Sequence, residues 1–175
     1  MILDANYLFD GTVSTTTFSV SGSAVTGFTA GGVASTNVID LANARDMGIG
    51  DAPALKVMVL VTAAFTTTGT ASTTMAINIQ GAPTNTAGAS WVTYATAGAA
   101  YASASLTAGT KIQIDVPPVN PDSGPLPRFL RLSYVLGGPG STFSAGSLVS
   151  AIVLGSDRFP GQAGSAYPSG ITISN

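Results

Sequence analysis

Thr74-Met75-Ala76-Ile77-Asn78-Ile79-Gln80 is the stretch that decides the fold class of this 175-residue chain. Its apolar side chains alternate with small or polar ones, which places the two kinds on opposite faces of a β-strand. The same alternation recurs in short segments along the chain, and no window keeps the 3.6-residue apolar period of an amphipathic helix. We therefore predict an all-β protein.

Seven other segments carry a strand pattern and are separated by Gly, Pro, Asn and Ser/Thr clusters. They are residues 17–21, 37–41, 55–61, 91–94, 111–116, 128–136 and 148–154, and a weaker triplet lies at 171–173. Residues 55–61 (LKVMVLV) are apolar at nearly every position, which predicts a central strand covered on both faces. About eight short strands predict a jelly-roll-like antiparallel β-sandwich.

The pattern also predicts the domain organisation. We expect one sandwich domain over residues 17–155, an N-terminal arm over 1–16 and a Gly/Pro/Ser-rich C-terminal arm over 156–175. The small-residue run 95–106 is compatible with a loop, an edge strand or a contact surface. Residues 117–127 hold five prolines and are predicted to form a loop.

The composition excludes several classes of function. Only 8% of the residues are charged, and there is neither Cys nor His. Disulfides, thiolate metal sites and cysteine nucleophiles are therefore absent, as is the side chain best suited to proton transfer near neutral pH. All eight acids are Asp, and the net charge is −2. The six Lys and Arg residues are scattered singly, which does not fit a nucleic-acid or anionic-membrane surface.

Neither a membrane span nor a secretory signal is expected. The longest strongly apolar stretch, residues 57–65, is much shorter than the roughly 20 residues of a spanning helix. The first six residues contain no base and carry Asp4, unlike a signal peptide.

The candidate catalytic and metal motifs are weak. Asp46 and Asp51 flank two glycines, but the loop lacks the alternating oxygen ligands of a calcium site, and a turn is the preferred interpretation. A Ser or Thr nucleophile would need Lys56 or Lys111 as its base, and both alternate with apolar residues at expected solvent-facing strand positions. No spacing selects a carboxylate pair. We predict a protein that is not an enzyme, with no cofactor and no metal.

Two groups of side chains suggest binding surfaces. Arg131 falls on the same strand face as Phe129, which favours a partly exposed face or a protein contact over nucleic acid. Trp91, Tyr94 and Tyr101 could line a glycan platform, although such residues more often lie in a core or at its rim.

The chain resembles the Bbp16-type capsid cement proteins of tailed bacteriophages. The resemblance rests on five pieces in the family's order: residues 1–5 (MILDA), 37–50 (NVIDLANARDMGIG), 128–135 (RFLRLSYV), a turn predicted at 143–146 (FSAG), and 167–170 (YPSG). It implies a jelly-roll protein on the outer surface of an assembled capsid, made in the host cytoplasm and carried in the virion. It also implies self-association, as a dimer or a trimer, and bridging of neighbouring major capsid protein subunits against internal DNA pressure.

Extended terminal arms can add strands to a partner's sheet, so we expect the arms and the 43–51 loop to contact the capsid. The predicted contact residues are Met1, Ile2, Leu3, Tyr7, Phe9, Arg45, Asp46, Phe159, Tyr167 and Ile171. The alternative function is a phage or cell-surface adhesin, a receptor-binding β-module that recognises a glycan through its aromatic residues.

Overall fold

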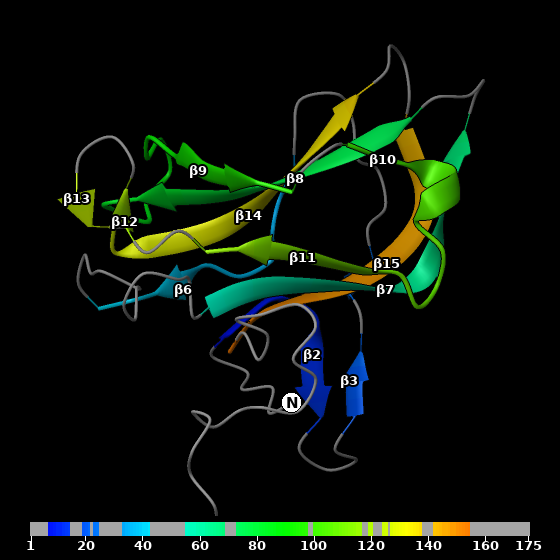
Figure 1. The fold of residues 1–175 in the computed structure, drawn as a ribbon, viewed down its shortest axis with the longest axis horizontal. Helices are drawn as coiled ribbons and strands as arrows, with labels where there is room; N and C mark the ends of the chain where they lie inside the picture. Colours follow the sequence, from blue (N-terminus) through cyan, green and yellow to red (C-terminus); the bar gives the residue numbers. More distant parts are fainter. Residues whose placement is uncertain are drawn as a thin grey trace, which may run out of the picture.

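The computed structural model of the chain is an antiparallel β-sandwich of two sheets (Figure 1). The structure describes residues 7–14, 19–21, 23–24, 33–42, 55–68, 73–97, 100–116, 119–120, 124–125, 127–137 and 142–154. The predicted all-β class is confirmed. Over these residues no helix is long and apolar enough to cross a membrane.

The first sheet has the order β1-β15-β7-β11, with β4 pairing β15 beside β1. Its strands are β1 (Leu8–Asp10), β4 (Ser23–Ala24), β7 (Leu55–Thr68), β11 (Lys111–Asp115) and β15 (Thr142–Leu154). The predicted strand at 55–61 is indeed central. Val57, Val59 and Val61 are fully buried between the sheets, while Met58 and Leu60 are half-buried on the outer face.

The second sheet has the order β10-β8-β14-β5, with β9 pairing β8 and β6 pairing β14. Its strands are β5 (Val33–Ala34), β6 (Ile39–Asp40), β8 (Thr74–Ala82), β9 (Val92–Thr96), β10 (Tyr101–Ala102) and β14 (Phe129–Gly137). The run 95–106 thus contains the end of β9, the edge strand β10 and a short 3-10 helix, Ser103–Ser105. Two small ladders, β2 (Thr12–Ser14) with β3 (Ser19–Ser21) and β12 (Val119–Asn120) with β13 (Gly124–Pro125), lie outside the two sheets.

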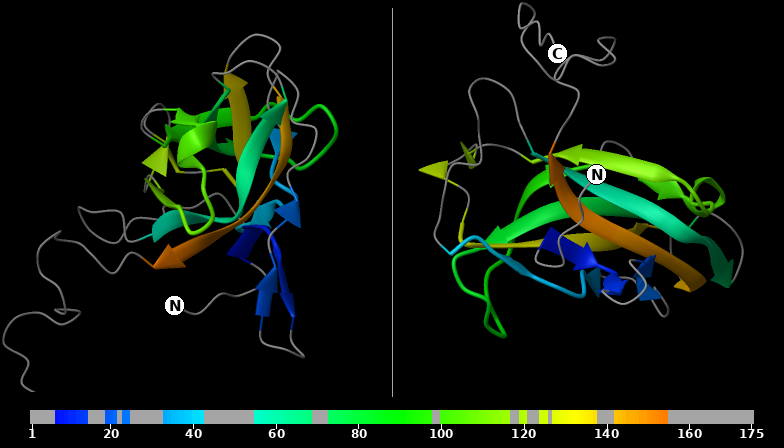
Figure 2. Two further views of the ribbon diagram at one scale, coloured as in Figure 1. Left: turned by 90° about the vertical axis from the view of Figure 1, so that its right-hand side faces the viewer. Right: turned by 90° about the horizontal axis from the view of Figure 1, so that it is seen from below.

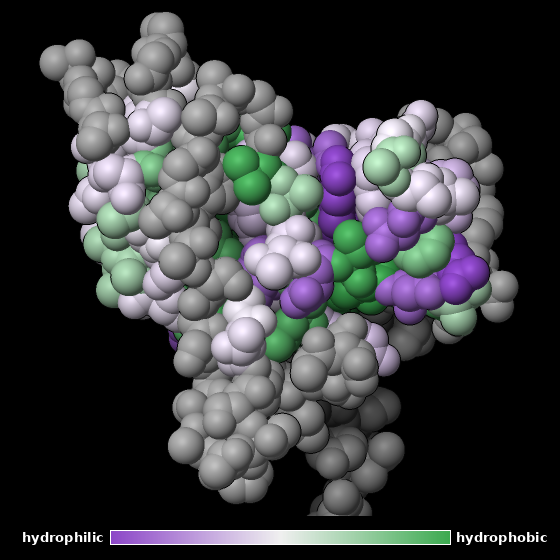
Figure 3. Space-filling view, turned by 180° about the vertical axis from the view of Figure 1, so that it is seen from behind, coloured by the Kyte–Doolittle hydropathy of each residue, from purple (hydrophilic) through white to green (hydrophobic). Residues whose placement is uncertain are grey.

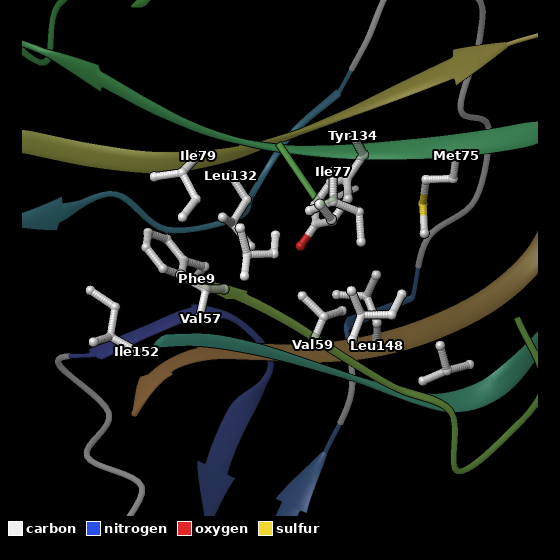
Figure 4. Packing of buried hydrophobic residues seen from close by; sticks show 14 of the residues in the cluster. Phe9, Val57, Val59, Met75, Ile77, Ile79, Leu132, Tyr134, Leu148 and Ile152 are labelled. Carbon is white, nitrogen blue, oxygen red and sulfur yellow. The ribbon is translucent and has the colours of Figure 1, made fainter. Parts of the chain in front are cut away.

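The core lies between the two sheets (Figures 2 and 4). The second sheet contributes the alternating residues Met75, Ile77 and Ile79 of β8, as the sequence predicts. The neighbouring strand of the same sheet, β14, contributes the inward-pointing side chains Leu130, Leu132, Tyr134 and Leu136, all of which are buried. The whole cluster removes more than twenty side chains from water, and such apolar burial is the main driving force for folding.

The predicted boundary at residue 16 is not where the sandwich begins. β1 lies inside the segment expected to be an arm, yet it pairs with β15 through Leu8 opposite Ala151. Leu8 also packs with Val149 and Ala151 in a second buried cluster, on the outer face of the first sheet. The C-terminal arm, residues 156–175, lies outside the described residues, as does the strand triplet at 171–173.

The segment 143–146 is part of β15 rather than the turn expected from the sequence. The register of β15 against β7 shifts between Phe143 and Leu148, so the strand continues through bulges. Gly146 has φ +148°, and a Cβ there would lie 2.6 Å from the ring of Phe65. Phe65 in turn meets Phe143 edge to face, with ring centroids 5.0 Å apart.

We expect Gly146→Ala to lower the free energy of unfolding by about 1–3 kcal/mol, because the methyl group overpacks the core and the backbone disfavours it. Equilibrium unfolding in urea measures this change. Gly109→Ala is the matched control, since Gly109 also has a positive φ, +91°, but no atom within 4 Å of the added Cβ. Equal losses in both variants would contradict the role assigned to the Phe65 contact.

Candidate functional site

A buried carboxyl group, that of Asp10, joins the N-terminal strand to both sheets. Its Oδ2 accepts hydrogen bonds from Tyr134 Oη (2.5 Å) and Ser150 Oγ (2.8 Å). Its Oδ1 accepts from the backbone N–H (2.8 Å) and the Oγ1 (3.0 Å) of Thr36. Tyr134 belongs to β14 and Ser150 to β15, so one side chain of β1 connects the two layers. We call Asp10, Thr36, Tyr134 and Ser150 the Asp10 cluster.

The Asp10 cluster is buried except at Thr36, which is exposed at its edge. Tyr134 and Ser150 are essentially fully buried, and Asp10 is 4% exposed. Figure 4 shows the Tyr134 hydroxyl pointing into the space between the sheets. Burial, together with the negative charge of Asp10, raises the pKa of Tyr134 well above 10. Its hydroxyl therefore remains a proton donor throughout the physiological range.

Two of the residues predicted to contact the capsid lie in or next to β1. Tyr7 immediately precedes β1 and is 49% exposed, and its capsid contact stays a prediction. Phe9 is wrong as a surface contact, because its side chain is fully buried in the core and its carbonyl accepts a hydrogen bond from Asn37 N–H (2.8 Å). The other eight lie outside the described residues: Met1, Ile2, Leu3, Arg45, Asp46, Phe159, Tyr167 and Ile171.

Two groups of polar side chains lie on the second sheet away from the core. The first is centred on Arg131. Its guanidinium lies over the ring of Trp91, 4.1 Å from the centroid, and its Nε donates to Gln80 Oε1 at 3.0 Å. Gln80 Nε2 in turn donates to Thr93 Oγ1 at 3.4 Å. Partial burial lowers the pKa of Arg131 from its ordinary value. Because the Trp91 ring and the guanidinium already cover each other, they form a fixed, half-buried surface rather than an open aromatic face.

The second group is an ion pair at the end of the same sheet. Arg128 donates through Nε to Asp40 Oδ1 and through Nη2 to Asp40 Oδ2, both at 2.7 Å. This bidentate geometry joins the residue before β14 to the end of β6, and Arg128 also lies 4.8 Å from the centroid of the Phe129 ring. Hydrogen bonding to Arg128 is the main reason that the pKa of Asp40 falls to about 2.

We predict that Arg128→Gln will return the pKa of Asp40 from about 2 toward 3.8, its ordinary value. A lowered carboxyl pKa stabilises the fold above the pKa of the unfolded chain, and this contribution disappears as the pH falls toward 2. NMR titration of the Asp40 carboxyl carbon in the native chain and in Arg128→Gln measures the shift. An Asp40 pKa that is unchanged in Arg128→Gln would contradict the pairing.

The three aromatic residues considered for a glycan platform do not form one. Trp91 lies on the outer face of the second sheet beneath Arg131. Tyr94 and Tyr101 pack against the core on the inner side, and Tyr94 lies beside the position that a Cβ of Gly81 would occupy. The rings therefore occupy opposite faces of the sheet, and no described surface stacks all three against a sugar.

The residues weighed for catalysis are also dispersed. Lys56 and Lys111 lie on the outer face of the first sheet, as predicted, and Lys56 pairs with Asp115 at 3.4 Å. Within the described ranges, no three acidic residues come together as a metal site would require. Asp46 and Asp51 lie outside these ranges. Among the described polar groups, the Asp10 cluster is the one that holds the N-terminal strand against both sheets.

Figure 3 shows the face opposite the view of Figure 1, where the hydrophobic described residues form small areas interrupted by polar ones. Such a mixed surface, with few charges, is similar to that of a non-obligate protein interface. Sequence comparison adds one finding. The family model described as Bbp16 matches residues 18–153, which is most of the chain. No curated protein matches the sequence.

Proposed function

Because this chain belongs to the Bbp16 family, we propose that it is a structural cement protein that binds the outer surface of an assembled bacteriophage capsid and bridges neighbouring major capsid protein subunits. The family match carries the proposal. It extends over nearly all of the described strands, from before β3 to the penultimate residue of β15. The proposed role is stabilisation of the shell against internal DNA pressure. It requires no catalysis, cofactor, nucleic acid or membrane.

The chemistry of the surface supports this role. Docking a surface with few charges requires little desolvation of ions, so a modest interface can still be favourable. Many copies bound side by side to a regular shell multiply the effect of each weak contact. A protein of this kind needs a rigid body and accessible docking segments more than it needs a deep pocket.

The position of the chain ends supports docking through the two arms. Leu8 pairs antiparallel with Ala151, so the chain enters β1 at the same end of the first sheet where β15 leaves it at Leu154. Segments 1–6 and 155–175 therefore join the sandwich next to each other. The half-exposed Tyr7 lies at this junction. We propose that the two arms, with Tyr7, reach one common area of the capsid.

Co-sedimentation of the purified protein with assembled capsids tests the proposal. We expect saturable binding with a fixed number of copies per major capsid protein subunit, because the sites belong to a regular lattice. Capsids already carrying a saturating amount of protein serve as the competitor control. Failure to sediment with capsids, or binding without saturation, would contradict a cement role.

A further inference from the structure

Strand β11 is an open edge of the first sheet. β7 pairs with one side of it, and no described strand pairs with the other (Figure 2, right). The side chains alternate strictly: Ile112 and Ile114 are buried in the core, whereas Lys111, Gln113 and Asp115 are exposed. An edge of this kind can add a further strand.

The hydrogen-bond register shows which backbone groups face outward. Val61 N–H donates to Thr110 C=O at 2.9 Å, and the next hydrogen-bonded positions along the ladder are Ile112 and Ile114, two residues apart. The residues that alternate with Thr110, Ile112 and Ile114 therefore have their backbone N–H and C=O groups pointing away from β7. These are Lys111, Gln113 and Asp115, the same residues whose side chains are exposed.

The sequence of this edge, Lys-Ile-Gln-Ile-Asp, is complementary to itself in the antiparallel direction. If two copies pair about Gln113, each Lys111 lies opposite the Asp115 of the second copy. Ile112 then lies opposite Ile114. The outward-facing backbone groups also fall into register, since residues 111 and 115 form hydrogen-bonded pairs on either side of a central 113–113 pair.

We propose that β11 is a homodimer interface in which two copies of this chain join their first sheets edge to edge about a twofold axis at Gln113. The proposal deepens the self-association that accompanies the proposed function and identifies the partner as a second copy of the chain. It does not depend on capsid binding. An isologous contact of this kind closes after two copies.

The charges at this edge select the antiparallel arrangement. Charged residues on an edge strand ordinarily prevent pairing. Here a parallel, in-register pair would place Lys111 beside Lys111 and Asp115 beside Asp115, whereas the antiparallel pair brings opposite signs together. Asp115 already lies 3.4 Å from Lys56 of its own chain, but no described acid forms an ion pair with Lys111. A second copy would supply that acid.

Variants that reverse the charge of Lys111 or of Asp115 test the proposal in solution. The experiment needs no capsids, so its result is independent of the capsid-binding experiment. Light scattering coupled to gel filtration should show a dimer for the native chain. Lys111→Asp and Asp115→Lys should each raise the dissociation constant by roughly tenfold or more, because each places like charges opposite one another twice. An equimolar mixture of the two variants should form a heterodimer, since both opposing pairs are then of opposite sign.

Two further variants separate pairing from a general effect on charge or folding. Ala87→Asp adds an acid at an exposed position of the loop between β8 and β9 and should remain dimeric. Gln113→Pro removes the central N–H donor on the outward side and should give a folded monomer by circular dichroism. A monomeric or trimeric native chain would overturn the proposal, as would Lys111→Asp and Asp115→Lys variants that stay dimeric or fail to rescue each other.

Discussion

Replacing Asp10 by Ala should destabilise the protein by about 3–5 kcal/mol, the largest loss that we expect from any exposed or buried acid among the described residues. The change removes the acceptor of four hydrogen bonds at once. It leaves the hydroxyls of Tyr134 and Ser150 buried without that acceptor. The two hydroxyls remain 3.2 Å from each other, but each loses a charged acceptor, and such a loss is costly for a buried group.

Equilibrium unfolding in urea measures the loss, and Asp115→Ala is the matched control. Asp115 is exposed and forms one ion pair within its chain, so its replacement should cost less than about 1 kcal/mol when unfolding is measured at protein concentrations where the chain is monomeric. Ser150→Ala, which removes only one donor to Asp10, should fall between the two. If Asp10→Ala were no more destabilising than Asp115→Ala, the Asp10 cluster would not be the connection between β1 and the two sheets.

The second large effect concerns capsid binding. Deleting residues 1–6 should abolish capsid occupancy while leaving a folded sandwich, because the deletion stops before the buried residues of β1. A deletion that continues through Phe9 would remove a core side chain and would confound binding with folding. Occupancy is measured by co-sedimentation with purified capsids, and folding by circular dichroism and urea unfolding.

Tyr7→Ala provides the matched point variant for this deletion. Tyr7 is half-exposed at the junction of the arm with β1, so its truncation should weaken capsid binding with little change in stability. A protein that lacks residues 1–6 and still decorates capsids at full occupancy would refute the assignment of the N-terminal arm.

Several strands were predictable because their side chains alternate in hydropathy. Met75, Ile77 and Ile79 of β8 are buried as predicted, and so are Ile112 and Ile114 of β11. This signal depends only on neighbouring residues. Where one face of a strand is buried and the other is not, it is sufficient to locate the strand.

Other strand segments could not be predicted from alternation. Leu8, Phe9 and Asp10 of β1 are all buried, so the strand has no polar face to reveal it. The start of β15 is rich in Ser, Ala and Gly and contains bulges, which break the two-residue period. Physical contacts with β7 and Phe65, rather than local preference, keep that segment extended.

The Asp10 cluster was also beyond local sequence patterns. Asp10 is 124 residues from Tyr134 and 140 residues from Ser150 along the chain. Nothing in the three-residue strand Leu8–Asp10 distinguishes a buried, fully hydrogen-bonded acid from a turn-forming one. The composition did indicate a surface with few charges. It could not show that Arg128 forms an ion pair with Asp40, because that contact depends on the pairing of β14 with β6.

Imaging of virions by electron cryo-microscopy at side-chain resolution tests the capsid-cement role most directly. We predict density for this sandwich on the outer surface of the capsid, with the junction of β1 and β15 facing the major capsid protein. Density for the sandwich at the tail, or a capsid surface without it, would contradict the proposed function.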